Sequence, residues 1–260
     1  MQKMHASGEK ISMLTCYDAS FAALLDECMV DVLLVGDSLG MVIQGHASTL
    51  PVSMADMCYH VTAVARGCQR SLLIADMPFG SSQISAPDTF GNAVKLMQAG
   101  AQMVKIEGGA EMSETVSFLC SRGIPVCAHI GLQPQSVHLL GGYKIQGASA
   151  GNADRIASDA LALQNAGATM ILMEAVPAEV AARISNQLVI PTIGIGAGGA
   201  TSGQVLVLYD MLDITLGKKP RFVKNYMHGA ISIAEAVKSY VADVKSGMFP
   251  ADEHGYGSHF

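Results

Sequence analysis

The sequence predicts a single (β/α)₈ barrel, because three observations agree. Short apolar runs alternate with helical patterns seven or eight times along 260 residues, without a linker or a shift in composition. Each strand–helix unit takes about 20 to 45 residues, and eight such units suit a closed barrel of about 250 residues. Several apolar runs end in a carboxylate, as expected where strand ends face one active site. We therefore expect one domain over residues 1–260, with an additional C-terminal helix.

The predicted strands are runs of adjacent apolar residues, which are typical of strands buried on both faces of a parallel sheet. We predict them at residues 11–18, 32–36, 71–75, 103–107, 125–129, 169–174 and 190–195. The last apolar run, at 211–216, is predicted as the eighth strand, which would close the barrel.

The predicted helices have apolar residues at helical spacing, and several carry end signals. Ser53 is a typical N-cap with Asp56 three residues later, and Pro87 and Gly100 mark the two ends of another helix. We predict helices at 20–29, 53–66, 86–99, 111–121, 153–166, 178–188, 201–208 and 226–245. The glycine-rich connections 39–50 and 131–151 are predicted as loops, the longer of them a lid or binding loop, and 251–260 as a flexible tail.

Composition excludes several classes of protein. Half of the residues are hydrophobic and 15% are charged, which is too apolar for a disordered chain. The net charge is −6 and no cluster of Lys and Arg occurs, so a nucleic-acid partner is not expected. No run of about 18 uncharged apolar residues indicates a membrane span, and residues 1–10 do not resemble a signal peptide. The six cysteines form no CxxC pair, and we expect reduced thiols in a cytoplasmic protein.

Acidic residues end three of the predicted strands or follow directly after them, namely Asp37, Asp76 and Glu107. At one barrel rim these carboxylates would repel each other unless a cation lay between them. Ligation by oxygen alone favours a hard ion such as Mg²⁺. The alternative is that each acid caps a helix or lies in a surface loop.

Three further residues at strand ends are candidates. Lys105 lies on the same side of its strand as Glu107, so it could hold a substrate carboxylate or form a structural ion pair. His129 ends its strand and could be structural or catalytic. Glu174 follows a very apolar strand, where burial would raise its pKa and suit a general base, unless it is a solvated loop residue.

Residues 194–199 match the pattern G-x-G-x-x-G, which is found at dinucleotide sites. Such fingerprints usually open the first βαβ unit, whereas this one follows the seventh predicted strand. We favour a tight glycine turn whose backbone N–H groups face an anion.

An ordered series of motifs resembles the ketopantoate hydroxymethyltransferase family, from about residue 15 to the tail. The motifs are DSLGM (37–41), QGH (44–46), ADMPF (75–79), VKIEGG (104–109), PVCAHIGL (125–132), PQS (134–136), GGYK (141–144), EAVP (174–177) and IGIGAG (193–198). Cys16 stands where the family often has Ala, and Ser82 where Tyr is frequent.

The resemblance implies a TIM barrel of the phosphoenolpyruvate/pyruvate superfamily that acts in pantothenate and coenzyme A biosynthesis. It implies hydroxymethyl transfer from 5,10-methylenetetrahydrofolate to 3-methyl-2-oxobutanoate, giving 2-dehydropantoate, and assembly as a homodecamer. Glu174 would be the catalytic base. The implied Mg²⁺ ligands are Asp37, Asp76 and Glu107. The implied substrate contacts are Asp37, Ser38, Asp76, Lys105 and His129.

Two other classes of protein stay open on the sequence. The first is a C–C lyase acting on a 2-hydroxy or 2-keto diacid, which would need a cation for the second carboxylate, and no Arg ends a predicted strand. The second is a non-catalytic binding barrel, or an oxidoreductase that holds a dinucleotide at residues 194–199.

Overall fold

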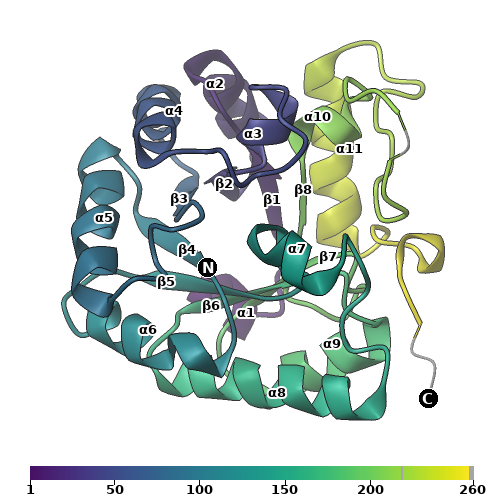
Figure 1. Cartoon of the computed structure of the whole chain (residues 1–260). Helices are drawn as coiled ribbons and strands as arrows, with labels where there is room; N and C mark the ends of the chain where they lie inside the picture. The colour runs from purple at the N-terminus through teal and green to yellow at the C-terminus, as the bar shows by residue number, and fades with distance from the viewer. Residues whose placement is uncertain (218, 258–260) are drawn as a thin grey trace.

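Eight parallel strands form a closed barrel in the computed structural model, which describes residues 1–217 and 219–257. Each strand pairs in parallel with the next, and the last pairs with the first, so the predicted TIM barrel is confirmed (Figure 1). The strands are β1 (Ile11–Thr15), β2 (Val32–Val35), β3 (Leu72–Asp76), β4 (Met103–Glu107), β5 (Val126–Gly131), β6 (Met170–Glu174), β7 (Thr192–Ile195) and β8 (Gly203–Leu206).

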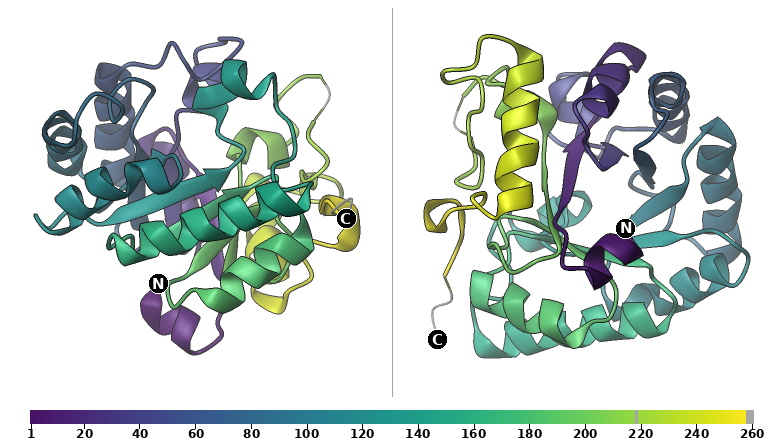
Figure 2. Two further views of the ribbon diagram at one scale, coloured as in Figure 1. Left: turned by 60° about the horizontal axis from the view of Figure 1, so that its bottom comes forward. Right: turned by 180° about the vertical axis from the view of Figure 1, so that it is seen from behind.

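Helices surround the barrel, and α8 and α9 lie side by side along one flank (Figure 2). The longer helices are α2 (Ala19–Glu27), α4 (Met54–Gly67), α5 (Ala86–Ala99), α6 (Ser113–Cys120), α8 (Ala150–Asn165), α9 (Ala178–Gln187) and α11 (Ile233–Ser246). The shorter ones are α1 (Gln2–Ala6), α3 (Leu39–Val42), α7 (Val137–Leu140), α10 (Leu208–Met211) and the 3₁₀ helices η1 (Ala110–Met112), η2 (Pro134–Ser136) and η3 (Asp252–His254). No helix in the two described ranges combines the length and the apolar character needed to cross a membrane.

Side-chain caps fix several helix ends. Ser53 and Asp56 form a reciprocal capping box at α4, as the sequence predicts. Asp18, predicted at the end of the first strand, instead caps α2 by accepting the N–H of Phe21, so that strand ends at Thr15. Ser232 caps α11, which therefore begins at Ile233 rather than at the predicted residue 226.

Two predictions near the C-terminus are wrong. The helix predicted at 201–208 is replaced by β8, which pairs with β1 and β7. The strand predicted at 211–216 holds the end of α10 and a loop. Gly203 allows the closure of the barrel, because a Cβ there would lie 2.3 Å from the carbonyl oxygen of Ile11. The two long loops also hold short helices, α3 in one and η2 with α7 in the other.

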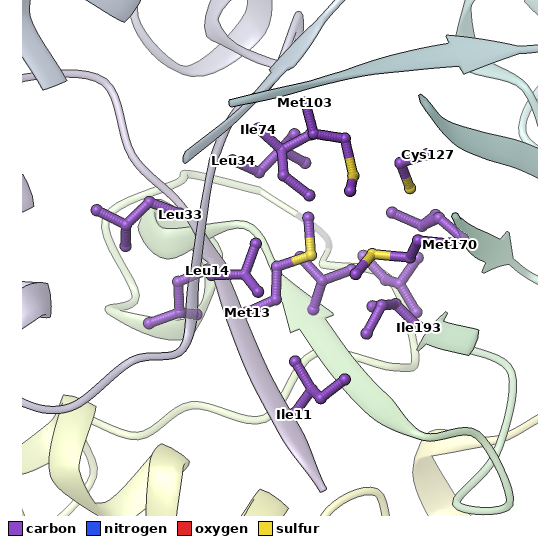
Figure 3. Packing of buried hydrophobic residues seen from close by; sticks show 14 of the residues in the cluster. Ile11, Met13, Leu14, Leu33, Leu34, Ile74, Met103, Cys127, Met170 and Ile193 are labelled. Atoms are coloured by element: carbon purple, nitrogen blue, oxygen red, sulfur yellow. The ribbon is translucent and has the colours of Figure 1, made fainter. Parts of the chain in front are cut away.

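Methionine and aliphatic side chains fill the barrel beneath the strand ends. Met13, Met103 and Met170 come together inside it (Figure 3), and all three are buried. Met fills irregular space well because its chain is unbranched. On β4 the side chains alternate in direction, so Met103 lies on the same face as Lys105 and Glu107. The apolar core is therefore the floor of the region that holds the charged residues.

The C-terminal segment returns to the barrel. It contains η3, and the carbonyl of Tyr256 accepts the N–H of Ala178 at the start of α9 over 2.9 Å. Part of the predicted tail, residues 258–260, lies outside the described residues.

Candidate active site

One cavity of about 760 Å³ opens at the C-terminal ends of the strands. It is lined by every residue that the sequence analysis assigns to the site. These are Asp37 and Ser38 after β2, Asp76 on β3, Lys105 and Glu107 on β4, His129 on β5, and Glu174 on β6. The structure thus brings together residues that are far apart in the sequence.

Three carboxylates and one ammonium group form the centre of the site. Lys105 Nζ makes an ion pair with Asp76 and lies 3.9 Å from Oε1 of Glu107. The backbone N–H of Asp37 donates to Oδ2 of Asp76 over 2.9 Å. Each of the four side chains belongs to a residue at most 6% exposed. If all four side chains were ionised, they would carry a net charge of −2, with almost no water to screen it.

The pKa values reflect this crowding. Burial raises the pKa of Asp37 well above its ordinary range, and the charges of Asp76 and Glu107 raise it further. Burial also raises the pKa of Glu107 to about 7, although Lys105 opposes the shift. Burial alone would lower the pKa of Lys105, but the neighbouring carboxylates, Asp76 first, outweigh it and raise that pKa. The site is therefore an acidic cluster that one lysine neutralises only in part.

The donor set fits a hard divalent cation. Among the residues that the structure describes, no three His, Cys, Asp or Glu side chains already stand in a metal-binding arrangement. The excess negative charge and the oxygen ligands nevertheless suit Mg²⁺. Oε1 of Glu107 is buried and makes no hydrogen bond within the described ranges, so it has an unused ligand position. Asp37, Asp76 and Glu107 are thus suitable ligands by type, charge and burial.

His129 lies between the acidic cluster and Glu174. Its Nδ1 is 3.5 Å from Oε1 of Glu107, and its Nε2 is 3.4 Å from Oε2 of Glu174. Burial lowers the pKa of His129 well below its ordinary value, and Lys105 lowers it further, so the ring is neutral. Burial raises the pKa of Glu174 to about 8, and the charge of Glu107 adds to the shift. The Glu174 side chain keeps 16% of its surface exposed, so it can reach a molecule in the cavity.

Close packing against Gly36 helps to position Ser38. A Cβ on Gly36 would lie 2.8 Å from Oγ of Ser38 and 3.4 Å from Oδ2 of Asp76, so a larger residue would displace the Ser38 side chain. The hydroxyl of Tyr17 lies 2.9 Å from the same Oγ. Ser38 is therefore held by a buried tyrosine that the sequence analysis did not identify.

The sequence analysis also missed a buried amide and much of the outer wall. Gln135 donates from Nε2 to Oδ2 of Asp37 over 2.9 Å. Tyr143, Phe222 and Tyr256 line the cavity from loops and from the C-terminal segment. Gln135 lies within the motif PQS, which is one of the motifs that carry the family resemblance and so pointed to this segment. By contrast, no sequence pattern around Tyr256 indicates that this residue lines the cavity.

Close packing accounts for the glycine-rich turn after β7. Gly196 has φ +62°, and a Cβ there would lie 2.7 Å from the ring of Phe222 and 3.0 Å from that of Tyr256. A Cβ on Gly198 would lie 2.6 Å from that of Ala178. The turn is thus covered by aromatic rings and by α9, and the predicted anion-facing role is not needed to explain its glycines.

A barrel with buried charged side chains in a cavity at the carboxyl ends of its strands has the architecture of a (β/α)₈ enzyme. The chain belongs to the ketopantoate hydroxymethyltransferase family, whose model matches residues 1–252. It is 61% identical to the 3-methyl-2-oxobutanoate hydroxymethyltransferase of Nitrosospira multiformis, covering 98% of this chain and 97% of that one. The enzyme of the same name from Nitrosomonas europaea is 60% identical, over 98% of this chain and 95% of the relative. This membership leaves the lyase, oxidoreductase and non-catalytic alternatives without support.

Solved structures with the same fold include phosphonopyruvate hydrolase in complex with oxalate and Mg²⁺, with a TM-score of 0.61 and 12% identity over 79% of this chain and 78% of that one. Another is 2,3-dimethylmalate lyase, a member of the PEP mutase/isocitrate lyase superfamily. Its TM-score is 0.59 and its sequence is 14% identical, over 79% of this chain and 78% of the lyase chain. At these identities the similarity concerns the fold alone.

Proposed function

We propose that this protein transfers a hydroxymethyl group from 5,10-methylenetetrahydrofolate to 3-methyl-2-oxobutanoate and so forms 2-dehydropantoate in pantothenate biosynthesis. Family membership and relatives about 60% identical support the reaction. The observation that carries the mechanism is the position of Glu174, a carboxyl group with a pKa of about 8, beside a partly neutralised acidic cluster in one cavity.

Asp37, Asp76 and Glu107 would hold Mg²⁺. Bound there, the ion supplies a Lewis acid for the keto and carboxylate oxygens of the substrate. Lys105 adds a fixed positive charge, and Ser38 a hydroxyl, for the substrate's oxygens. These groups are already positioned by the fold, so little reorganisation is needed when negative charge develops.

Glu174 is the proposed base. It takes the proton from C3 of the keto acid, and the electron pair of the broken C–H bond moves toward the keto oxygen. Water opens the N–CH₂–N bridge of the folate, which leaves as tetrahydrofolate and releases the one-carbon unit as formaldehyde. The nucleophilic carbon then bonds to the carbon of that formaldehyde, while its C=O π electron pair takes up a proton and becomes the hydroxyl of the new hydroxymethyl group. A carboxylate of raised pKa suits this step, since a base is most effective when its pKa lies near the working pH. Neutral His129 lies against Glu174 and also contacts the substrate pocket.

The outer part of the cavity provides room for the folate. A five-carbon keto acid fills only a small part of about 760 Å³. Tyr143, Phe222 and Tyr256 line the remainder, and aromatic walls suit a planar ring system. Assembly as a homodecamer is part of the proposal through the family. A cytoplasmic location also belongs to it, and the free thiols of all six cysteines support that location.

The direct test is product formation by the purified protein. With 3-methyl-2-oxobutanoate, 5,10-methylenetetrahydrofolate and Mg²⁺, we expect 2-dehydropantoate, detected by mass spectrometry. No product in the complete mixture, from folded protein, would contradict the proposed reaction. Product that still forms after chelation of divalent ions would contradict the role of the metal.

A further inference from the structure

Gln135 is a buried amide whose two side-chain N–H donors are both used at the site. It lies in η2, just after β5, and is 5% exposed. Its Nε2 donates to Oδ2 of Asp37 and to the carbonyl oxygen of Met77, each over 2.9 Å. Its Oε1 accepts from Nε2 of Gln83 over 3.2 Å. The reversed amide orientation is excluded, because it would place Oε1 against two acceptors.

The backbone of the same residue contacts a second acid of the cluster. The N–H of Gln135 donates to Oε2 of Glu107 over 3.1 Å. Gln135 thus bonds to one oxygen of a carboxylate after β2 and to one oxygen of a carboxylate on β4. The other oxygen of Glu107, Oε1, is buried without a hydrogen bond in the described part of the chain. In both Asp37 and Glu107, therefore, one carboxylate oxygen accepts a hydrogen bond from Gln135, and the other oxygen does not.

We propose that Gln135 is the positioning residue of the candidate cation site. It orients Asp37 and Glu107 so that their remaining oxygens can bind a divalent ion, and it does not touch the substrate or the ion itself. The inference rests on the proposed function, since it assumes the cation. Groups that hydrogen-bond to metal ligands fix the ligands' orientation, and their loss typically lowers metal affinity about 10- to 100-fold.

Gln135 also links the site to the rim. Oε1 of Gln83 accepts the N–H of Gly80 over 2.8 Å and the N–H of Ser82 over 3.2 Å. The connection between β3 and α5 is therefore tied, through two amides, to the carboxylate of Asp37. Gln83 is exposed, so water can replace its bond to Gln135 at little cost.

The test is a titration of the metal-free protein with Mn²⁺, in which electron paramagnetic resonance measures free Mn²⁺. Gln135→Met keeps the length of the side chain and removes both N–H donors. We expect its Kd for Mn²⁺ to rise about tenfold, since the backbone contact to Glu107 remains. A loss of stability alone would not change Mn²⁺ affinity in this way.

Gln133→Met is the matched control, because Gln133 lies two residues away and does not line the cavity; its Kd should equal the wild-type value. If Gln135→Met does not fold, Gln135→Ala is measured with the same expectation. A Kd within twofold of wild type in a folded Gln135 variant would overturn the proposal. The proposal would also be overturned if Gln83→Met lost as much affinity for Mn²⁺ as Gln135→Met, because the Gln83 variant keeps the bond between Gln135 and Asp37.

Asp76→Asn separates this inference from the proposed function. If Asp76→Asn loses Mn²⁺ affinity and Gln135→Met does not, the cation site stands and the positioning role of Gln135 fails. If Asp76→Asn also binds Mn²⁺ as the wild type does, the cation site itself is wrong, and the proposed mechanism fails with it.

Discussion

Oε2 of Glu174, at the end of β6, lies 3.4 Å from Nε2 of His129 on the neighbouring β5. The imidazole is 1% exposed and neutral, so it separates the candidate base from Glu107 without adding a charge. Strands β5 and β6 are adjacent, and Glu174 pairs with Gly131, two residues beyond His129 on the same strand, so the barrel itself sets this spacing. The pair is therefore built into the scaffold rather than into a mobile loop.

His129→Asn should lower kcat up to about 100-fold, because Glu174 loses the ring that lies against it and small misplacements of a catalytic group are costly. The KM for the keto acid should change less, as Lys105 and Ser38 remain. Steady-state kinetics at saturating Mg²⁺ check this expectation. His138→Asn, at an exposed histidine in α7, serves as the control. Wild-type kcat in His129→Asn would show that His129 has no part in positioning the base.

Asp76→Ala should abolish both activity and its dependence on Mg²⁺, and should also destabilise the fold. The change removes the nearest ion-pair partner of the buried Lys105 ammonium and leaves Glu107, 3.9 Å away, as its partner; breaking a buried pair costs up to about 3–5 kcal/mol. Chemical denaturation of the metal-free protein measures this loss of stability. Asp154→Asn, at an exposed surface ion pair with Arg183, should change stability by less than about 1 kcal/mol. An active variant at Asp76 that needs no metal would refute its assignment as a ligand.

The stability of the metal-free protein should fall as the pH rises from 7 to 8. In this range folded Glu174 still holds a proton, because its pKa is raised from 4.5 to about 8, whereas the unfolded chain has released it. Its stabilising contribution is therefore complete below the unfolded pKa and is lost as the pH rises through the folded one. The pH range 7 to 8 avoids His129, whose lowered pKa affects stability only near and below 6.5.

For one such group the slope is about −1 kcal/mol per pH unit. Urea unfolding in a chelating buffer measures it, and Glu174→Gln should have a shallower slope than the wild type. Equal slopes in the two proteins would show that Glu174 does not titrate with a raised pKa.

Much of the fold follows from local pattern, because buried parallel strands are apolar throughout and their helices carry caps. The strand β8 was the exception. Gly203 and Gln204 interrupt its apolar character, and the more apolar run that follows them gave a false eighth strand. The pairing of β8 with β1, which closes the barrel, joins two segments about 190 residues apart, and no local window contains that contact.

The strand-end acids were predictable for the same reason that makes barrels suitable for catalysis: parallel strands bring their carboxyl ends to one rim. Gln135, in the 3₁₀ helix η2, and Tyr17, in the loop after β1, contact predicted site residues that are distant in the sequence. Their roles depend on tertiary geometry, so the residue type alone could not indicate them. Tyr256 reaches the cavity only because the C-terminal segment folds back onto α9.

The central claim is that Glu174 removes the C3 proton of the keto acid, and isotope exchange tests it without the folate. In D₂O with Mg²⁺, nuclear magnetic resonance should show the wild-type protein replacing the C3 proton of 3-methyl-2-oxobutanoate by deuterium. Glu174→Gln should slow exchange by at least about 100-fold while its circular dichroism spectrum is unchanged. Glu114→Gln, on the exposed face of α6, should exchange at the wild-type rate. Wild-type exchange in folded Glu174→Gln would contradict the account.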